Sequence, residues 1–551
     1  MRHLAWTALA WLTCAAAGQT APADAPVPPQ LTADQGAGLV RLARMAMRRY
    51  LTHRMPADEM PVVRELEALT RRSNVAAVTL RSRGAVKAFQ VGEGQDLCTN
   101  VIAAALRAMR SSELPDRVDR KVLDALTVEV EVLSAVQPVG RADLARSIVP
   151  GRTGLVYSRA AGKAWILPSR AYVLGLDADG MRRRAMEGLP LRGETASRRG
   201  ELGLFLTRHY VGFPGGRTLE LFRGKDLARR RKIDQKALRA AAEQVGQYLL
   251  RRQDADGRYV PHASRASLRD HLYAAWAMAQ LARRVPRGPF GRSAAAAAAY
   301  AARQVDRAGG AARVPAGTQR DTIAATALLA LALGEGRGDE KDRKLREDLV
   351  AGLAAELEKI DFAKLPGRPK AASAALYLAF LALVAGEQPA AARAEKIAKL
   401  RKGILLFTPG GAPERLWAYR AGLTDALPLA GSDQLLDPSA LRQLAGEGLP
   451  DEKGGFAPAG GQAGTVLTGL TAVCISQALR RPGKPPAEQA RRLQQQRDEA
   501  RAFCFRMMYQ PGEAYFAEKP DDWVGAVRVA PADAAVTLPA CAAAIEAFLA
   551  D

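Results

Sequence analysis

Aromatic residues are scarce in this chain and make up 6% of its 551 residues. Cysteine and histidine are scarcer still, with five of each. The sequence has no Gly-x-x-x-x-Gly-Lys-Ser/Thr phosphate loop, no Gly-x-Ser-x-Gly elbow, no His-Glu-x-x-His pair and no Cys-x-x-Cys. These absences argue against a P-loop nucleotide site, an elbow-type serine hydrolase and a local zinc site. We therefore expect no cofactor and no metal.

Long apolar runs are also absent, since a membrane-spanning helix takes about 20 apolar residues. The N-terminus instead has a short apolar run at residues 4–12, basic residues before it, and small residues at 15–18. This order is typical of a secretory signal peptide, with cleavage after Ala17 or Gly18. We therefore expect an exported protein, periplasmic or secreted, without a transmembrane anchor.

A lipid anchor at Cys14 is disfavoured by the residues before it. Such sites place a leucine three residues before the cysteine and a small residue directly before it, whereas this chain has Trp11 and Thr13. The remaining cysteines, even in number, permit disulfides in an oxidising compartment without requiring them. Small buried hydrophobic residues are the simpler interpretation of these four cysteines: Cys98, Cys474, Cys504 and Cys541.

Acidic residues are outnumbered by basic ones, giving a formal net charge of +23. The arginines are scattered, and the longest basic block is residues 229–232, without interleaved aromatics. This pattern favours solvated faces over a nucleic-acid footprint, so we expect no specific nucleic-acid partner. An anionic polymer or a polysaccharide fits the charge, and a protein partner is also possible.

The length exceeds what one hydrophobic core normally supports, so at least two domains are expected. Residues 31–50 and 97–109 have helical periodicity, whereas 75–81 are rich in β-formers. At 126–136, valines at 128, 130 and 132 alternate with glutamates at 129 and 131, which predicts a half-buried strand. Residues 154–157 and 164–167 predict a hairpin. The first part of the chain is therefore α+β.

Several of these segments resemble one known family. The runs are Thr127 to Ser134, then Pro138, then Gly151 to Val156, then Ala164 to Pro168, and finally Leu219 to Phe222. In this order and spacing they look like the AMMECR-one domain family, over roughly residues 35–225. The resemblance implies an α+β fold whose biochemical role is poorly defined, in relatives that are typically cytoplasmic.

One distinctive element of that family is altered here. Its Leu-Arg-Gly-Cys-Ile-Gly motif is replaced by residues 87–92, of which only Gly92 is kept, and Gln90 stands at the place of the cysteine. Since nucleophilic or redox chemistry there would require a thiolate, no cysteine-based activity transfers to this chain. Lys87 and Gln90 remain candidates for ligand binding.

After residue 234 the β-rich alternation disappears and a helical repeat follows. A glycine-rich turn ends in an apolar residue and a proline, and an alanine- and leucine-rich helix begins some residues later. The clearest copies end at Pro261, Pro315 and Pro458, and weaker ones at Pro366, Pro409 and Pro531. These copies predict about six helix pairs, since each pair must bury its apolar face against neighbours.

Such a repeat resembles an α/α toroid of the terpenoid cyclase and protein prenyltransferase superfamily, over roughly residues 235–551. Specific chemistries of that superfamily lack support here. Asp254 and Asp256 do not complete an Asp-x-Asp-Asp acid and are interpreted as turn residues. Prenyltransferases need zinc held by cysteine and histidine together, for which there is no local candidate.

Polar residues near the starts of the inner helices are the site candidates, because a toroid opens there into a central funnel. They are Asp270, His271, Arg320, Asp321, Arg415, Tyr419 and, less clearly, Asp425. Asp270 and Asp321 could act as acid and base on a sugar, with His271 as a proton shuttle. The simpler interpretation is that the two aspartates cap helices and that His271 is packed nearby.

We therefore predict a multidomain protein with an α+β domain followed by an all-α (α/α)6-like toroid. The expected divisions are a signal peptide at 1–18, a proline-rich linker at 19–34, an AMMECR-one-like domain at 35–225, a basic connector at 226–234 and the toroid at 235–551. The favoured function is a binding or scaffold protein, because no catalytic signature is found. The alternative is a periplasmic enzyme that acts on a carbohydrate or a similar polymer.

Overall fold

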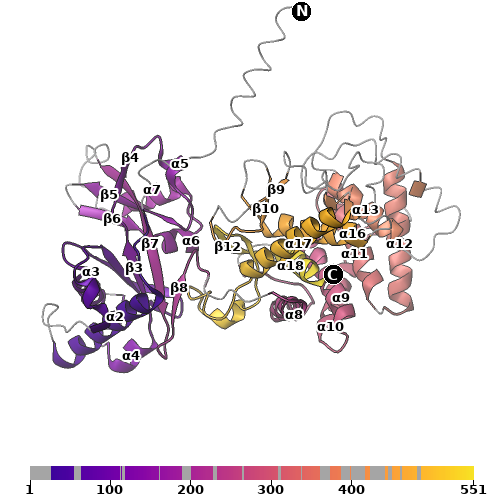
Figure 1. The fold of residues 1–551 in the computed structure, drawn as a ribbon. Helices are drawn as coiled ribbons and strands as arrows, with labels where there is room; N and C mark the ends of the chain where they lie inside the picture. Colours follow the sequence, from indigo (N-terminus) through magenta and orange to yellow (C-terminus); the bar gives the residue numbers. More distant parts are fainter. Residues whose placement is uncertain are drawn as a thin grey trace, which may run out of the picture. The chain divides into compact units, whose positions relative to one another are not determined.

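The computed structural model describes most of the chain between residues 27 and 550 (Figure 1). Outside the description lie 1–26, 55–63, 112, 115–117, 160–161, 189–199, 227–232, 263–265, 308–311, 337, 360–372, 386–396, 399–415, 418, 422–440, 445–448, 459–461, 481–484 and 551. The chain divides into two compact units: one of residues 1–82 and 86–223, and one of residues 83–85 and 224–551. The expected signal peptide and most of the expected connector fall outside the described residues. Within these described residues, no helix is both long and apolar enough to cross a membrane.

The first unit is built on one curled antiparallel sheet. Its strands are β1 (Ala76–Ser82), β2 (Ala85–Gly92), β3 (Thr127–Leu133), β4 (Gln137–Val139), β5 (Thr153–Arg159), β6 (Gly162–Ile166), β7 (Glu201–Gly212) and β8 (Thr218–Leu221). The hydrogen-bonded order is β2-β1-β3-β7-β5-β6, and β4 and β8 also pair with β7. The long strand β7 is therefore the centre of the sheet, and the expected hairpin is formed by β5 and β6.

Helices cover the sheet of the first unit. They are α2 (Ala33–His53), α3 (Leu97–Ala108), α4 (Arg120–Ala125), α5 (Leu144–Ser147), α6 (Pro168–Val173) and α7 (Ala178–Glu187), with a 3-10 helix η2 (Arg64–Leu69). The apolar stripe expected at residues 31–50 is buried at Leu39, Leu42 and Ala43, and Thr32 caps α2 in a capping box. Together with α3, this helix packs against the face of the sheet that carries Val128 and Val130.

The opposite face of β3 corrects a prediction from the sequence. Its alternation of valine and glutamate predicted a strand with one solvated face, but Glu129 and Glu131 are each only 1% exposed. Because the sheet curls, this second face is turned inward. Its neighbours there include Phe205 on β7 and Trp165 on β6, which pack together in an apolar cluster. The glutamates are therefore interior charges that need partners.

The second unit is helical. Its helices are α8 (Gln235–Arg251), α9 (Leu268–Arg284), α10 (Phe290–Ala302), α11 (Gln319–Glu335), α12 (Glu340–Glu358), α13 (Ser373–Val384), α16 (Thr465–Arg480), α17 (Ala487–Met507) and α18 (Leu538–Leu549), with a 3-10 helix η8 (Pro520–Trp523). Two short strand pairs accompany them: β9 (Leu441–Gln443) with β10 (Phe456–Pro458), and β11 (Arg528–Ala530) with β12 (Asp533–Val536).

Five of these helices form one row of neighbours. The row runs α16, α18, α9, α11 and α13, while α8, α10, α12 and α17 each pack against members of it. Helices of the row therefore alternate along the chain with helices that cover it. The last helix, α18, lies beside α8 and α9, so the end of the unit is next to its beginning.

The glycine-rich turns of the repeat have a shared structural role. In three copies, the backbone N–H of the apolar residue after the turn donates to a side chain twelve residues later on a helix of the row. The pairs are Tyr259 to His271 (3.1 Å), Val314 to Thr326 (2.9 Å) and Phe456 to Thr468 (2.9 Å). Each bond fixes a turn onto the helix that follows it.

Glycine is required in the first of these turns. Gly257 has a φ of +93°, and a Cβ there would lie 2.4 Å from the backbone oxygen of Ala296. Asp254 accepts hydrogen bonds from the backbone N–H groups of Asp256 and Arg258, as expected for a turn residue.

A buried lysine lies at the start of the second unit. Lys225 is 2% exposed, and its ammonium donates to Glu513 (2.7 Å) and to the carbonyl of Met508 (2.6 Å). Burial lowers the pKa of Lys225 to about 7; Glu513 opposes this shift, and Arg528 adds to it. Lys225 therefore binds its proton more weakly in the folded chain than in the unfolded chain.

Stability of the second unit is expected to rise with pH through this group. Between pH 7 and the unfolded lysine pKa of about 10.4, the unfolded chain binds the proton and the folded chain does not. Each pH unit in this range therefore adds at most about 1.4 kcal/mol to the free energy of unfolding. Urea unfolding of wild type and Lys225→Met between pH 6 and 9.5 measures this effect. We expect the wild type to gain stability relative to the variant as pH rises, and parallel curves would contradict the assignment.

Candidate functional site

The two aspartates proposed as an acid and base pair each lie three residues after the residue that caps their helix, Ser267 for Asp270 and Thr318 for Asp321. The backbone N–H of Asp270 donates to the Ser267 hydroxyl, and the Asp270 carboxylate accepts from the Ser267 N–H. Asp321 likewise lies three residues after the capping Thr318, and its carboxylate accepts a hydrogen bond from the Thr318 hydroxyl (2.7 Å). The structure does bring them together, because Arg269 bonds Asp321 at 3.2 Å and lies 3.5 Å from Asp270. Both carboxylates therefore contact one shared guanidinium.

His271 has neither ring nitrogen free. Its Nδ1 accepts from the Tyr259 N–H, and its Nε2 lies 3.0 Å from the carbonyl of Ala297, which fixes the neutral Nε2–H tautomer. Burial lowers the pKa of His271 to about 4. Its counterparts in the other copies of the turn are Thr326 and Thr468, so the histidine performs the structural role of a hydroxyl. A proton shuttle would have to break both bonds.

The other candidates of the helical unit are dispersed. Arg320 is partly exposed in the first turn of α11, and Tyr419 is buried in the hydrophobic core. Arg415 and Asp425 lie outside the described residues.

A cavity of about 510 Å³ lies at the opposite ends of the same helices. Its walls come from the C-terminal halves of α9, α11, α13, α16 and α18, together with Arg420. Four arginines and two glutamates line it: Arg283, Arg284, Arg420, Arg480, Glu335 and Glu546. The positive residues also suit the partial negative charge that helix C-termini carry.

Glu546 is the centre of the polar network in this cavity. Its carboxylate accepts from both terminal nitrogens of Arg420, from the Tyr273 hydroxyl (2.7 Å) and from the Gln280 amide (2.8 Å). The Arg420 guanidinium also lies 4.3 Å from the centre of the Trp276 ring. Glu546 is 2% exposed, so this is a buried and fully bonded ion pair.

Three polar groups of the same cavity are buried without a hydrogen-bond partner among the described residues. They are the indole N–H of Trp276, the hydroxyl of Ser476 and the side-chain carbonyl of Gln477. Trp276 is 4% exposed and Ser476 is 2% exposed. Leaving such a group unsatisfied costs about 1–3 kcal/mol, so the three groups are candidates for hydrogen bonds to water or to a ligand in the cavity.

This cavity was not predicted, because the polar residues that stand out in the sequence lie at the helix starts. One signal was available. Glu546 is the only charged residue in the apolar helix Leu538–Leu549, and a charge in such a helix is buried only when it is paired. Its partners Tyr273 and Arg420, however, are 273 and 126 residues away, and no local pattern connects them.

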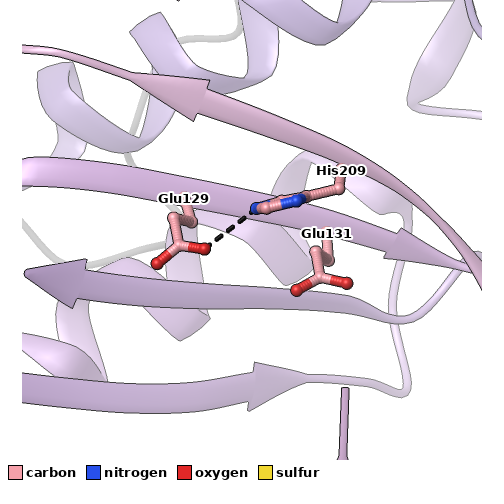
Figure 2. A group of neighbouring side chains, drawn as sticks. All are labelled: Glu129, Glu131 and His209. Atoms are coloured by element: carbon pink, nitrogen blue, oxygen red, sulfur yellow. Dashed lines mark hydrogen bonds and ion pairs between the residues drawn. The ribbon is translucent and has the colours of Figure 1, made fainter. Parts of the chain in front are cut away.

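The first unit holds a second polar group, formed by Glu129, Glu131 and His209 (Figure 2). His209 on β7 lies directly opposite Glu131 on β3, and its Nε2 is 2.9 Å from Glu129. Arg81 on β1 binds the other oxygen of Glu129. The strands therefore bring four titratable side chains together on the inward face of the sheet.

The pKa shifts in this group follow from burial and from the neighbouring charges. Burial raises the pKa of Glu129, but Arg81 and His209 outweigh it, so the net shift is downward. Burial dominates at Glu131 and raises its pKa, although Ser169 and Thr207 donate hydrogen bonds to its carboxylate. Burial alone would lower the pKa of His209, but the two glutamates raise it.

These three residues could be considered as metal ligands, since their ligand atoms lie within 4.8 Å of one another. A metal would require a neutral His209, whereas the two glutamates favour its protonated form. A divalent ion in place of the His209 proton would add one positive charge beside Arg81, among buried residues. The residues fit a network of ion pairs better than a metal site.

Lys87 and Gln90 both lie on β2. Gln90 is half-buried and lines a cavity of about 590 Å³ between β2 and β6. Lys87 is also half-buried, and its carbonyl accepts from the hydroxyl of Ser111.

The comparisons with known proteins address each part of the chain. The AMMECR1 family model matches residues 40–187, which agrees with the resemblance noted in the sequence. No curated protein matches the chain. An uncharacterised protein from Pyrococcus horikoshii is 21% identical, with a TM-score of 0.32, over 35% of this chain and 98% of its own. The GH76A alpha-1,6-mannanase from Salegentibacter sp. HEL1_6 is 9% identical, with a TM-score of 0.38, over 57% of this chain and 98% of its own. The expected likeness to terpenoid cyclases is not confirmed.

Proposed function

We propose that this chain is an exported binding protein whose helical unit is a closed α/α toroid that holds an acidic carbohydrate. The observation that carries this proposal is the set of unpartnered groups in the cavity at the C-terminal helix ends: Trp276, Ser476 and Gln477. The signal-peptide pattern at the N-terminus supports export.

The three groups suit sugar hydroxyls. An indole N–H only donates, an amide carbonyl only accepts, and a serine hydroxyl does both, whereas a sugar hydroxyl can bond all three. The chain as a whole has an excess of positive charge, with a formal net charge of +23. This excess favours a sugar that carries carboxylates or sulfates over a neutral one.

Binding is better supported than turnover, because the carboxylates at both ends of these helices already contact arginines. Glu546 accepts four hydrogen bonds, and Glu335 is bound by Arg283. Asp270 and Asp321 share Arg269 at the other end of the helices. Glycoside hydrolysis needs one carboxyl group that donates a proton and one that remains free to act as a base or nucleophile. The enzyme alternative therefore has the weaker support.

Calorimetric titration of the full chain with oligogalacturonate, and with a neutral manno-oligosaccharide for comparison, tests the proposal. We expect the acidic sugar to bind, and Ser476→Ala and Trp276→Phe each to weaken binding roughly fivefold to tenfold, the value of one hydrogen bond. Thr471→Val is the matched control, because its hydroxyl lies on the same helix and bonds the carbonyl of Leu467.

The outcomes separate the two functions. Equal affinity in Ser476→Ala and wild type, or binding of neither sugar, would overturn the proposal. Release of new reducing ends during the titration would favour the enzyme instead. Since Ser476 has no partner in the described part of the protein, its replacement should leave the melting temperature unchanged.

A further inference from the structure

A second cavity lies where the curled sheet of the first unit nearly meets itself. β2 and β6 are the two ends of the hydrogen-bonded strand order, yet both line one cavity of about 590 Å³. The ammonium of Lys163 on β6 also reaches Glu93, just after β2, at 2.7 Å. The two strands are therefore close without being hydrogen-bonded as a ladder, and the space between them is a gap in the sheet.

One wall of this cavity is apolar and the other is charged. The apolar wall includes Phe89 and Trp165, which belong to the inward cluster of the sheet. The charged residues are Lys163, Arg170, Arg184, Glu93 and Glu187. Glu93 pairs with Lys163, and Glu187 lies 3.6 Å from Arg184. These pairs leave Arg170 as the remaining cation.

Arg170 is half-buried in α6, and its guanidinium makes no hydrogen bond or ion pair with any residue that the structure describes. Burial lowers its pKa, and the charges of Arg184 and Arg81 act in the same direction, with only Glu113 opposing them. A guanidinium in this position is partly desolvated and repelled by its neighbours. An anion in the cavity would relieve both costs.

We propose that this cavity binds a small organic anion, a carboxylate or phosphate on a flat apolar body. Arg170 holds the anionic group, because a guanidinium presents two parallel N–H groups to a carboxylate or phosphate. Phe89 and Trp165 contact the apolar body, and the amide of Gln90 lies at the same cavity.

Benzoate and phenyl phosphate are the probes, with benzyl alcohol as a neutral analogue of similar shape. Titration of the full chain is expected to show benzoate or phenyl phosphate binding at least tenfold more tightly than benzyl alcohol. Arg170→Gln should weaken anion binding at least tenfold, and Arg170→Lys should give an intermediate loss. Arg183→Gln is the control, because Arg183 is exposed on α7 and does not line the cavity.

The proposal is overturned if Arg170→Gln binds the anions as wild type does, or if benzyl alcohol binds equally well. It is also overturned if neither anion binds. Arg170 makes no hydrogen bond or ion pair with any residue that the structure describes, and its charge is repelled by its neighbours, so Arg170→Gln should melt no lower than wild type. Carbohydrate binding by the helical unit should be unchanged in Arg170→Gln, which keeps the failure of one proposal separate from that of the other.

Discussion

Replacing Glu546 by alanine is expected to destabilise the helical unit by about 3–5 kcal/mol, because it leaves Arg420 buried without its countercharge. The same change removes the partner of the Tyr273 hydroxyl and of the Gln280 amide. Urea unfolding of the full chain, followed by circular dichroism, measures the loss. Glu347→Ala is the matched control, since Glu347 is exposed on α12 and its removal should change stability by less than about 0.5 kcal/mol.

A double variant separates the ion pair from the effect of an unpaired charge. Replacing both partners, as Arg420→Met with Glu546→Leu, should restore most of the stability, since apolar residues of similar volume often replace a buried pair at little cost. If the double variant is as unstable as Glu546→Ala alone, packing around α18 and not the uncompensated arginine causes the loss.

Replacing Glu129 by alanine is expected to be comparably severe in the first unit. The change removes the carboxylate that both the buried Arg81 guanidinium and the His209 ring contact. We expect a loss of about 3–5 kcal/mol in the free energy of unfolding of this unit. Hydrogen exchange of the β3 and β7 amides measures it without interference from the helical unit.

The control for this variant is Glu201→Ala, which removes an exposed glutamate from β7. Addition of zinc or manganese to wild type provides a further check on the ion network. If these residues form a network of ion pairs, neither metal should change the hydrogen-exchange protection of the β3 amides. A large increase in protection would show that Glu129, Glu131 and His209 are metal ligands.

The local structure of the chain followed from local sequence. Helix α2 formed where apolar residues recur at helical spacing. The turn that begins at Asp254 was likewise recognisable from aspartate and glycine alone. These features depend on residues within a few positions of one another, so sequence spacing is sufficient to predict them.

The surroundings of the charged residues followed from the tertiary structure. Alternation on β3 predicted correctly which residues share a face, but only the curl of the sheet decided that Glu129 and Glu131 are buried. In the helical unit, the sequence places Asp270 and Asp321 at helix starts, whereas their shared contact with Arg269 exists only because two helices meet in space.

The sequence by itself determined that the chain has an α+β part with an AMMECR1-like order of strands and a helical part built from repeated turns. Only the tertiary structure decided that the cavity of the helical part lies at the C-terminal helix ends, around a glutamate whose partners are 126 and 273 residues away. The physical reason is that secondary structure is governed by neighbours along the chain, whereas burial and charge pairing are governed by neighbours in space.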